Sequence, residues 1–239
     1  MTGTPEPLIG APALPASDRT ALLSDVLRHI RLTGSVFLQG EYSSAWALDS
    51  PDSSDIIKML APQAHRLILF HFVREGEAWF GAGGQRVEAV AGELVVLPHA
   101  HRHSMGSREP ATPVPIAGFL PPLPWDTMPV CRCGGGGAQT RIICGYLKSD
   151  EPLFNAFLRQ LPTIFRVAPP PGPMAGWIDA CVDYALHRSG QPTLVDATLM
   201  ARLPELLLAE ILRLYCEQHP PPKAGSRPSR TRWSAARSA

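Results

Sequence analysis

The segment that decides the fold is His71-Phe-Val-Arg-Glu-Gly-Glu-Ala-Trp-Phe80, together with Ala91-Gly-Glu-Leu-Val-Val-Leu-Pro-His99 and the nearby His103. Two adjacent hairpins can be drawn through these residues, because each stretch has two apolar runs on either side of a turn. Gly76 and Gly92 stand at the two turns, where glycine tolerates the positive φ of a tight turn. The segment therefore predicts four short strands joined in pairs.

Short apolar or alternating runs, bounded by Gly, Pro and Asp, continue on both sides of these hairpins. Many short strands with frequent turns are typical of a β-sandwich or barrel. From Asp150 onward the apolar residues recur at helical spacing, which predicts a fold that is mainly β followed by α. The expected strands cover residues 36–38, 45–48, 67–73, 78–80, 86–90, 94–97, 116–120 and 141–147; the expected helices cover residues 18–30, 152–161, 175–188 and 193–217, the last interrupted by Pro204.

The spacing within the segment resembles the two motifs of the cupin superfamily, whose fold is a small β-barrel. His71 and Glu77 stand as in the first cupin motif, with Val73 at the place of its second histidine. His103 stands as in the second motif, with Ala100 at the place of its glycine. The motif spacing that is typical of the barrel is therefore kept better than the set of residues that binds a metal.

A narrower resemblance is to the cupin-type sensor domain of AraC-type transcription regulators. It covers about residues 20–217, with the pieces in matching order and spacing. The resemblance implies a cupin-like, double-stranded β-helix barrel that senses a small-molecule effector, followed by helices that dimerise. The pieces that carry it are residues 25–37, Ala45-Trp46, residues 71–76, 91–99 and 140–145, Leu161-Pro162 and residues 202–213.

Shifts in composition and periodicity, together with this resemblance, divide the chain into four parts. These are a disordered lead (1–17), a cupin-like sensor barrel with an N-terminal helix (18–149), a helical dimerisation and linker segment (150–218), and a disordered basic tail (219–239). In the family a DNA-reading domain with two helix-turn-helix units follows, which takes roughly 100 further residues. We therefore expect a regulator truncated before its DNA-binding domain, with no DNA binding by this chain alone. Its expected partners are a small-molecule effector and a second copy in a homodimer, or a full-length relative in a mixed dimer.

Charge and composition exclude several classes of protein. The tail from Pro220 contains five of the 22 basic residues and none of the 21 acidic ones, so the rest of the chain carries a net charge of −4. An acidic body is not a broad nucleic-acid surface, so direct DNA binding by the basic tail alone is the remaining alternative of this kind. No apolar run approaches the roughly 18 residues of a membrane helix, and the start of the chain lacks a secretory signal. Five irregularly spaced cysteines indicate reduced thiols, so a cytoplasmic location is expected.

Three residues are candidates for a metal site. His71, Glu77 and His103 converge if all three face the inside of the barrel, and two imidazoles with a carboxylate suit Zn, Fe, Mn or Ni. Cys144 completes a soft site if it faces the same cavity, although a buried thiol usually acts as a small hydrophobe. Because Val73 replaces a further ligand, we favour structural histidines, no cofactor and a non-enzymatic sensor. The alternative is a free-standing cupin metalloenzyme that uses the His71, Glu77 and His103 triad with a divalent metal.

The ligand-binding candidates are His71, Trp79, His99 and His103. His99, His101 and His103 alternate along the chain, so on an extended segment they share one face. Trp79 is an aromatic residue able to line an apolar pocket.

Two cysteines and a run of glycines form a further motif at residues 131–137. The spacing of Cys131 and Cys133 is shorter than the common Cys-x-x-Cys zinc pair, and the four glycines lack the Lys and Ser or Thr of a phosphate loop. We predict a mobile loop between strands there, with thiol sensing as the alternative.

Overall fold

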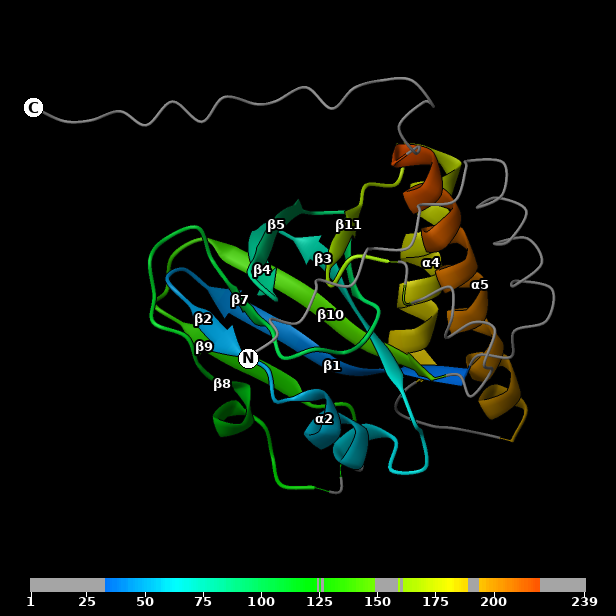
Figure 1. Cartoon of the computed structure of the whole chain (residues 1–239), viewed down its shortest axis with the longest axis horizontal. Coiled ribbons are helices and arrows are strands. Elements are labelled where there is room, and N and C mark those ends of the chain that lie inside the picture. Colours follow the sequence, from blue (N-terminus) through cyan, green and yellow to red (C-terminus); the bar gives the residue numbers. More distant parts are fainter. Residues whose placement is uncertain are drawn as a thin grey trace, which may run out of the picture.

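The computed structural model describes residues 33–123, 125, 127–148, 159, 161–188 and 194–219. The predicted lead, the predicted N-terminal helix, most of the helix expected over residues 152–161 and the tail from residue 220 lie outside the described residues. Within the described part, the fold is mainly β followed by α, as predicted (Figure 1).

Two sheets build the cupin barrel. Sheet A has the order β11 (Phe165–Val167), β6 (Leu94–Leu97), β3 (Leu67–Glu75), β10 (Gln139–Lys148), β1 (Thr33–Ser43) and β9 (Val130–Gly134). Sheet B has the order β5 (Gln85–Val90), β4 (Glu77–Ala82), β7 (Ser104–Gly106), β2 (Ala47–Asp49) and β8 (Val114–Pro115).

The four strands of the deciding segment are present, but the predicted pairing of each hairpin is wrong. β3 pairs with β6 in sheet A, and β4 pairs with β5 in sheet B. Gly76 and Gly92, with φ of 74° and 88°, are therefore corners at which the chain changes sheets. The hairpin turn lies between them at Gly83 and Gly84, which also have positive φ. Sequence spacing alone does not distinguish a hairpin turn from a corner, because both need glycine at the same point.

Strand β3 of sheet A is buried on both faces, which explains its uninterrupted apolar run. Alternate residues of this strand face the barrel interior, among them Leu69 and Val73. The residues between them, among them Phe70 and Phe72, face a second apolar cluster on the outside of the sheet. A strand covered on both sides loses the apolar and polar alternation of a half-exposed strand.

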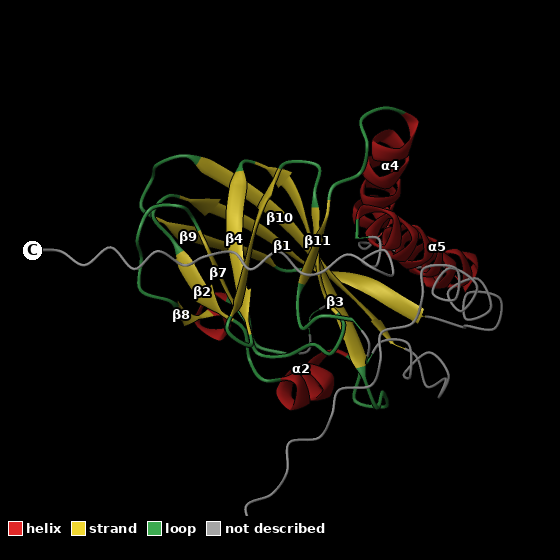
Figure 2. Cartoon of the chain, turned by 45° about the horizontal axis from the view of Figure 1, so that its top comes forward, coloured by secondary structure: helices red, strands yellow, loops and turns green. Residues whose placement is uncertain are grey.

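Helices α4 (Pro173–Arg188) and α5 (Leu194–Gln218) cover this outer face (Figure 2). Contrary to the prediction, α5 runs through Pro204 without a break, since the turns that follow pack Leu208 and Leu212 against the sheet. At the end of α5, the Gln218 side-chain amide donates to the carbonyl oxygen of Ala168 at 2.6 Å. No helix in the described ranges combines the length and the apolar character needed to cross a membrane.

Two further segments differ from the expectation. Residues 116–120 were expected to form a strand, but Ile116–Phe119 is a short 3-10 helix, η1, bordered by Pro115. A proline nitrogen has no hydrogen to give to a sheet, which limits strand pairing there. The helix α2 (Ser53–Leu60) begins within a Pro51-Asp-Ser-Ser54 sequence that is more typical of a turn. It starts where the Asp52 side chain accepts a hydrogen bond from the backbone N–H of Ser53 at 2.6 Å.

The Cys131 to Cys133 segment was predicted to be a loop, and this is wrong. It is strand β9, which pairs in parallel with β1 from Val130 to Gly134. Cys131 is fully buried, whereas Arg132 points outward and forms an ion pair with Glu41 at 2.8 Å. This alternation is that of a strand on the barrel wall, and the turn is confined to the glycines that follow.

Candidate functional site

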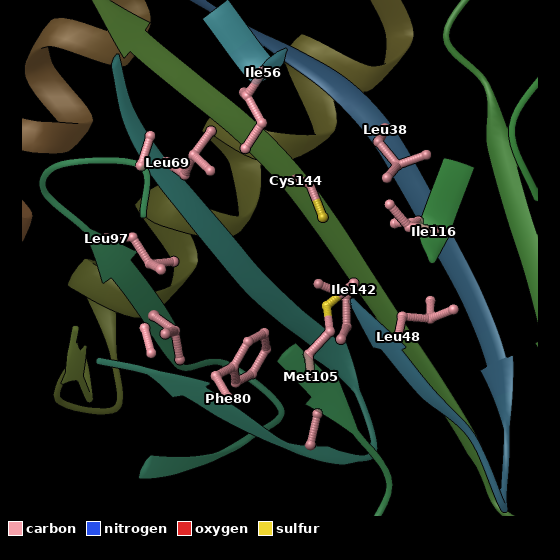
Figure 3. Close-up of a cluster of buried hydrophobic side chains, with 14 of the residues drawn as sticks. Leu38, Leu48, Ile56, Leu69, Phe80, Leu97, Met105, Ile116, Ile142 and Cys144 are labelled. Atoms are coloured by element: carbon pink, nitrogen blue, oxygen red, sulfur yellow. The ribbon is translucent and has the colours of Figure 1, made fainter. Parts of the chain in front are cut away.

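A cavity of about 40 Å³ lies inside the barrel. Its lining is almost entirely apolar, and α2 and η1 close it on one side with Ile56 and Ile116. Figure 3 shows Leu38, Leu69 and Cys144 from the strands of sheet A in the cluster that surrounds this space. The other lining residues are Phe37, Ser50, Pro51, Met59, His71, His103, Met105 and Leu120.

Two buried histidines form the polar part of the cavity wall. His71 lies on β3 and His103 directly precedes β7, and each is only 3% exposed. Their Nε2 atoms are 3.0 Å apart. The Nδ1 atom of His71 is 3.0 Å from Cys144 Sγ, and that of His103 is 2.8 Å from Ser50 Oγ and 3.1 Å from the carbonyl oxygen of His101. The four side chains form one continuous hydrogen-bonded chain.

Burial sets the charge state of these four hydrogen-bonded side chains. Burial lowers the pKa of His71 well below its usual value, and the neighbouring His103 lowers it further. Burial also lowers the pKa of His103 to about 4, against a smaller opposing effect of the His101 carbonyl. The pKa of the Cys144 thiol is raised by burial. Both imidazoles are therefore neutral, and the thiol is protonated, at neutral pH.

The direction of each hydrogen bond follows from one fixed acceptor. The carbonyl oxygen of His101 can only accept, so Nδ1 of His103 carries the hydrogen. Nε2 of the neutral His103 is then an acceptor for the Nε2–H of His71. Nδ1 of His71 remains as the acceptor for the thiol of Cys144. A thiol that stays protonated is a poor nucleophile. These hydrogen bonds therefore orient the two imidazole rings and do not activate the Cys144 sulfur.

Two of the predicted site residues lie elsewhere. Side chains alternate along β4, so Phe80 points into the barrel, where its ring stacks near His71, while Glu77 and Trp79 point outward. Glu77 forms an ion pair with Arg108 at 2.9 Å, and both residues line a separate hollow of about 220 Å³ on the outer face of sheet B, together with Trp79. The structure therefore does not bring Glu77 or Trp79 to the histidine pair.

The three alternating histidines do not share one face. Ala100 has a φ of 49°, which interrupts the extended backbone between His99 and His101. The rings of His99 and His101 are 5.4 Å apart, and the His101 side chain is exposed, whereas His103 is buried against His71. This left-handed backbone at residue 100 also explains why the second cupin motif has glycine at that place.

The residues at the cavity do not fit a catalytic metal. Among the described residues, no group of three or more His, Cys, Asp or Glu side chains is placed to hold a metal ion. His71 and His103 present two nitrogens to each other, and the Cys144 sulfur lies at the opposite nitrogen of the His71 ring. Two nitrogen donors fall short of the three protein ligands of a catalytic zinc site.

One member of the hydrogen-bonded chain was missed by sequence reasoning. Ser50 lies between β2 and α2, next to Pro51, and serine before proline is an ordinary turn sequence. Its partner His103 is 53 positions away, so no local pattern connects the two residues.

A family model described as Cupin matches residues 21–217 of the chain. No curated protein is significantly similar to it. Among solved structures, YhaK from Escherichia coli is similar at 14% identity over 54% of this chain and 40% of that chain, with a TM-score of 0.30. ToxT from Vibrio cholerae O395 is similar at 6% identity over 77% of this chain and 55% of that chain, with a TM-score of 0.37. The AraC-like transcriptional activator CuxR is similar at 9% identity over 78% of this chain and 53% of that chain, with a TM-score of 0.36. The chain thus spans about half the length of the solved structures it matches.

Proposed function

Because the chain belongs to the cupins, and to the group of them that forms the ligand-binding part of AraC-type regulators, we propose that its barrel senses a small-molecule effector. The observation that carries this proposal is the apolar cavity whose polar wall is the His71 and His103 pair. Small-molecule sites are usually concave and mostly apolar, with a few well-placed polar groups. The chain then acts as a sensor in transcription regulation and not as an enzyme.

The size of the cavity indicates how a ligand enters. A volume of about 40 Å³ is far below the roughly 300–1,000 Å³ of a typical small-molecule pocket. The cavity is closed by α2, of which Ile56 is the buried residue, and by η1, of which Ile116 is the buried residue. Each of these two short elements buries a single residue, so we propose that they are the parts that move when a ligand binds.

A thermal shift screen with a matched pair of variants tests the sensor proposal. Compounds of low molecular mass are screened on the full chain, because a ligand that binds the native state raises its melting temperature. Ile116→Trp fills the cavity from η1 and should abolish the shift of any compound that binds there. Val114→Trp is the control, since Val114 is 40% exposed and does not line the cavity. A compound whose shift survives Ile116→Trp unchanged contradicts binding in the barrel.

The helices support a second part of the proposal, that two copies of the chain associate. Trp177 and Tyr184 are seven positions apart on α4, so they lie on one face of the helix, and each is 37% exposed. Leu206 on α5 is 58% exposed. Aromatic side chains on a helix face are typical of the centre of an interface. We propose that α4 and α5 form a homodimer contact.

Sedimentation of matched variants tests the dimer. The wild-type chain should have twice the 25.9 kDa mass of one copy. Trp177→Glu should shift it to the monomer mass, because a buried unpaired carboxylate opposes association. Val90→Glu, at an exposed apolar residue of β5, is the control that should stay dimeric. A monomeric wild-type chain contradicts the proposal.

A further inference from the structure

Two buried hydrogen-bond donors inside the barrel lack a strong acceptor. Tyr42 on β1 is fully buried and Trp46 is 2% exposed, with ring centroids 4.2 Å apart. Neither the Tyr42 hydroxyl nor the Trp46 indole N–H makes a hydrogen bond, and they are the two buried side-chain atoms in the described part of the chain of which this is true. Native proteins rarely leave such groups unpaired, since each costs about 1–3 kcal/mol.

The backbone of β1 directs the Tyr42 hydroxyl along the barrel interior. A Cβ added to Gly40 would lie 2.4 Å from two carbons of the Tyr42 ring and 2.5 Å from its hydroxyl oxygen, so the ring lies back over Gly40. Gly40 is opposite Ile142 on one side and Cys131 on the other. The hydroxyl therefore lies beside Cys131.

Tyr42 and Trp46 do not line the cavity described above. The ring of Tyr42 lies back over Gly40, however, and Leu38, two residues before Gly40 in the same interior cluster as Tyr42, does line it. Burial, followed by the nearby Cys144 and Cys131 thiols, raises the pKa of Tyr42 well above its usual value, so the hydroxyl keeps its hydrogen. Cys144 lines the cavity. The adjacent Cys131 thiol contacts the hydroxyl and contributes to its raised pKa. This contact lacks the geometry of a hydrogen bond, and a thiol is in any case a weak acceptor.

The charges around these donors restrict what can pair with them. The buried polar or charged residues of the described chain are His71, His103, Ser107 and Thr140. None of these is a lysine or arginine, and burial keeps both histidines neutral. A carboxylate or phosphate would lose its hydration here without a cation to compensate. The partner of two donors must therefore be an uncharged acceptor.

From this arrangement, and on the basis of the sensor function proposed above, we infer that the effector is an uncharged, mainly apolar molecule whose carbonyl oxygen accepts from Tyr42 and Trp46. Its apolar part extends into the cavity lined by Leu38 and Met105. Ketones, esters and lactones have this chemistry, since each combines a carbonyl acceptor with no donor.

The test uses two probes of the same shape, cyclopentanone and methylenecyclopentane, which differ in a carbonyl oxygen against a methylene group. The full chain is labelled with 15N-tryptophan, and the Trp46 indole resonance is identified by its loss in Trp46→Phe. Cyclopentanone should shift this indole proton downfield, because a new hydrogen bond forms to it. Methylenecyclopentane should bind without that shift.

Two matched tyrosine variants complete the test. Tyr42→Phe should weaken cyclopentanone binding about tenfold, which is the loss of one hydrogen bond, and leave methylenecyclopentane binding unchanged. It should not lower the melting temperature of the free protein, because it removes an unpaired donor. Tyr146→Phe is the control: its hydroxyl already donates to the Leu60 carbonyl oxygen at 3.2 Å, so this variant should lose stability and keep the ketone response.

The outcomes separate this inference from the sensor proposal. If both probes bind equally well and Tyr42→Phe changes neither, the carbonyl contact is wrong although the cavity still binds small molecules. If Tyr42→Phe lowers the melting temperature and leaves the ketone response intact, the hydroxyl serves an internal water and the inference fails. If neither probe binds the full chain, the cavity and the carbonyl contact fail together.

Discussion

The Nε2 atoms of His71 and His103 lie 3.0 Å apart in the barrel, although the two residues are 32 positions apart in the chain. The relationship depends on the corners of the fold, because His71 belongs to sheet A and His103 leads into a strand of sheet B. A hydrogen bond between them therefore ties the two sheets together inside the apolar core. Since both rings are buried and neutral, this contact makes the barrel sensitive to acid.

Acidification should destabilise the protein through these histidines. The pKa of His103 is lowered from 6.5 to about 4 in the folded state, so between these values the unfolded chain binds more protons. The free energy of unfolding is therefore highest above about pH 6.5. It decreases as the pH falls toward 4, by about 3 kcal/mol for His103 alone. His103→Gln removes this titration, so it should lose less stability than the wild type between pH 7 and 4.5 in urea unfolding. An identical loss in both proteins contradicts the prediction.

The thiol of Cys144 should matter as a hydrogen-bond donor. Cys144→Ser retains a donor for Nδ1 of His71 and should cost at most about 1 kcal/mol relative to wild type. Cys144→Ala leaves that nitrogen without a partner and should cost about 1–3 kcal/mol more. Urea unfolding at pH 7 measures both variants. Equal stability of the two variants shows that the thiol acts only as a small apolar group.

Space on the outer face of sheet A should be tightly limited at Gly145. A Cβ there would lie 2.0 Å from the ring of Phe70, its neighbour on β3. Gly145→Ala should therefore lower the melting temperature strongly, because overpacking costs about 1–3 kcal/mol or more. Gly176→Ala on α4 is the control, since a Cβ there meets nothing within 4 Å. That variant should be neutral or more stable by up to about 1 kcal/mol, because alanine favours a helix over glycine.

Most cysteines should resist alkylation in the folded protein. Cys131, Cys144 and Cys181 are buried, and burial raises the pKa of each thiol. Burial also raises the pKa of the half-buried Cys133 to about 11, and Cys131 raises it further. Iodoacetamide at pH 8, followed by mass spectrometry, should leave these four unmodified until urea is added. Fast labelling of Cys133 in the native state revives the thiol-sensing alternative for this segment.

Much of the barrel could be predicted from the sequence, because its strands depend on local patterns. The apolar runs located β3, β6 and β10, and Gly76 and Gly92 located two strand ends, although both were predicted as hairpin turns and are corners. Pairing could not be predicted in the same way, since the contact between β3 and β6 depends on residues far apart in the chain. Helix α2 was missed because its first residues are turn formers, and its position depends on burying Ile56 against the barrel.

The candidate site was predicted in part. His71 and His103 were identified by their spacing, and the structure brings them together. Glu77 fits the same spacing but lies on the outer face of β4, and spacing does not fix which face of a strand a residue occupies when a corner precedes it. No sequence motif marks Ser50, because its hydrogen bond to His103 joins residues far apart in the chain. No motif marks Tyr42 or Trp46 either, because only the folded barrel shows that their donors are buried without a strong acceptor.

The double burial of β3 has a consequence for how this gene can change. Successive residues of the strand belong alternately to the barrel and to the helix contact, as His71 and its neighbours Phe70 and Phe72 show. Insertion or deletion of one codon within β3 would exchange the two sets from that point on. The imidazole of His71 would then enter the apolar layer under α5, and a phenylalanine would enter the cavity of the barrel. Length variation should therefore be confined to the loops, while β3 tolerates substitutions only.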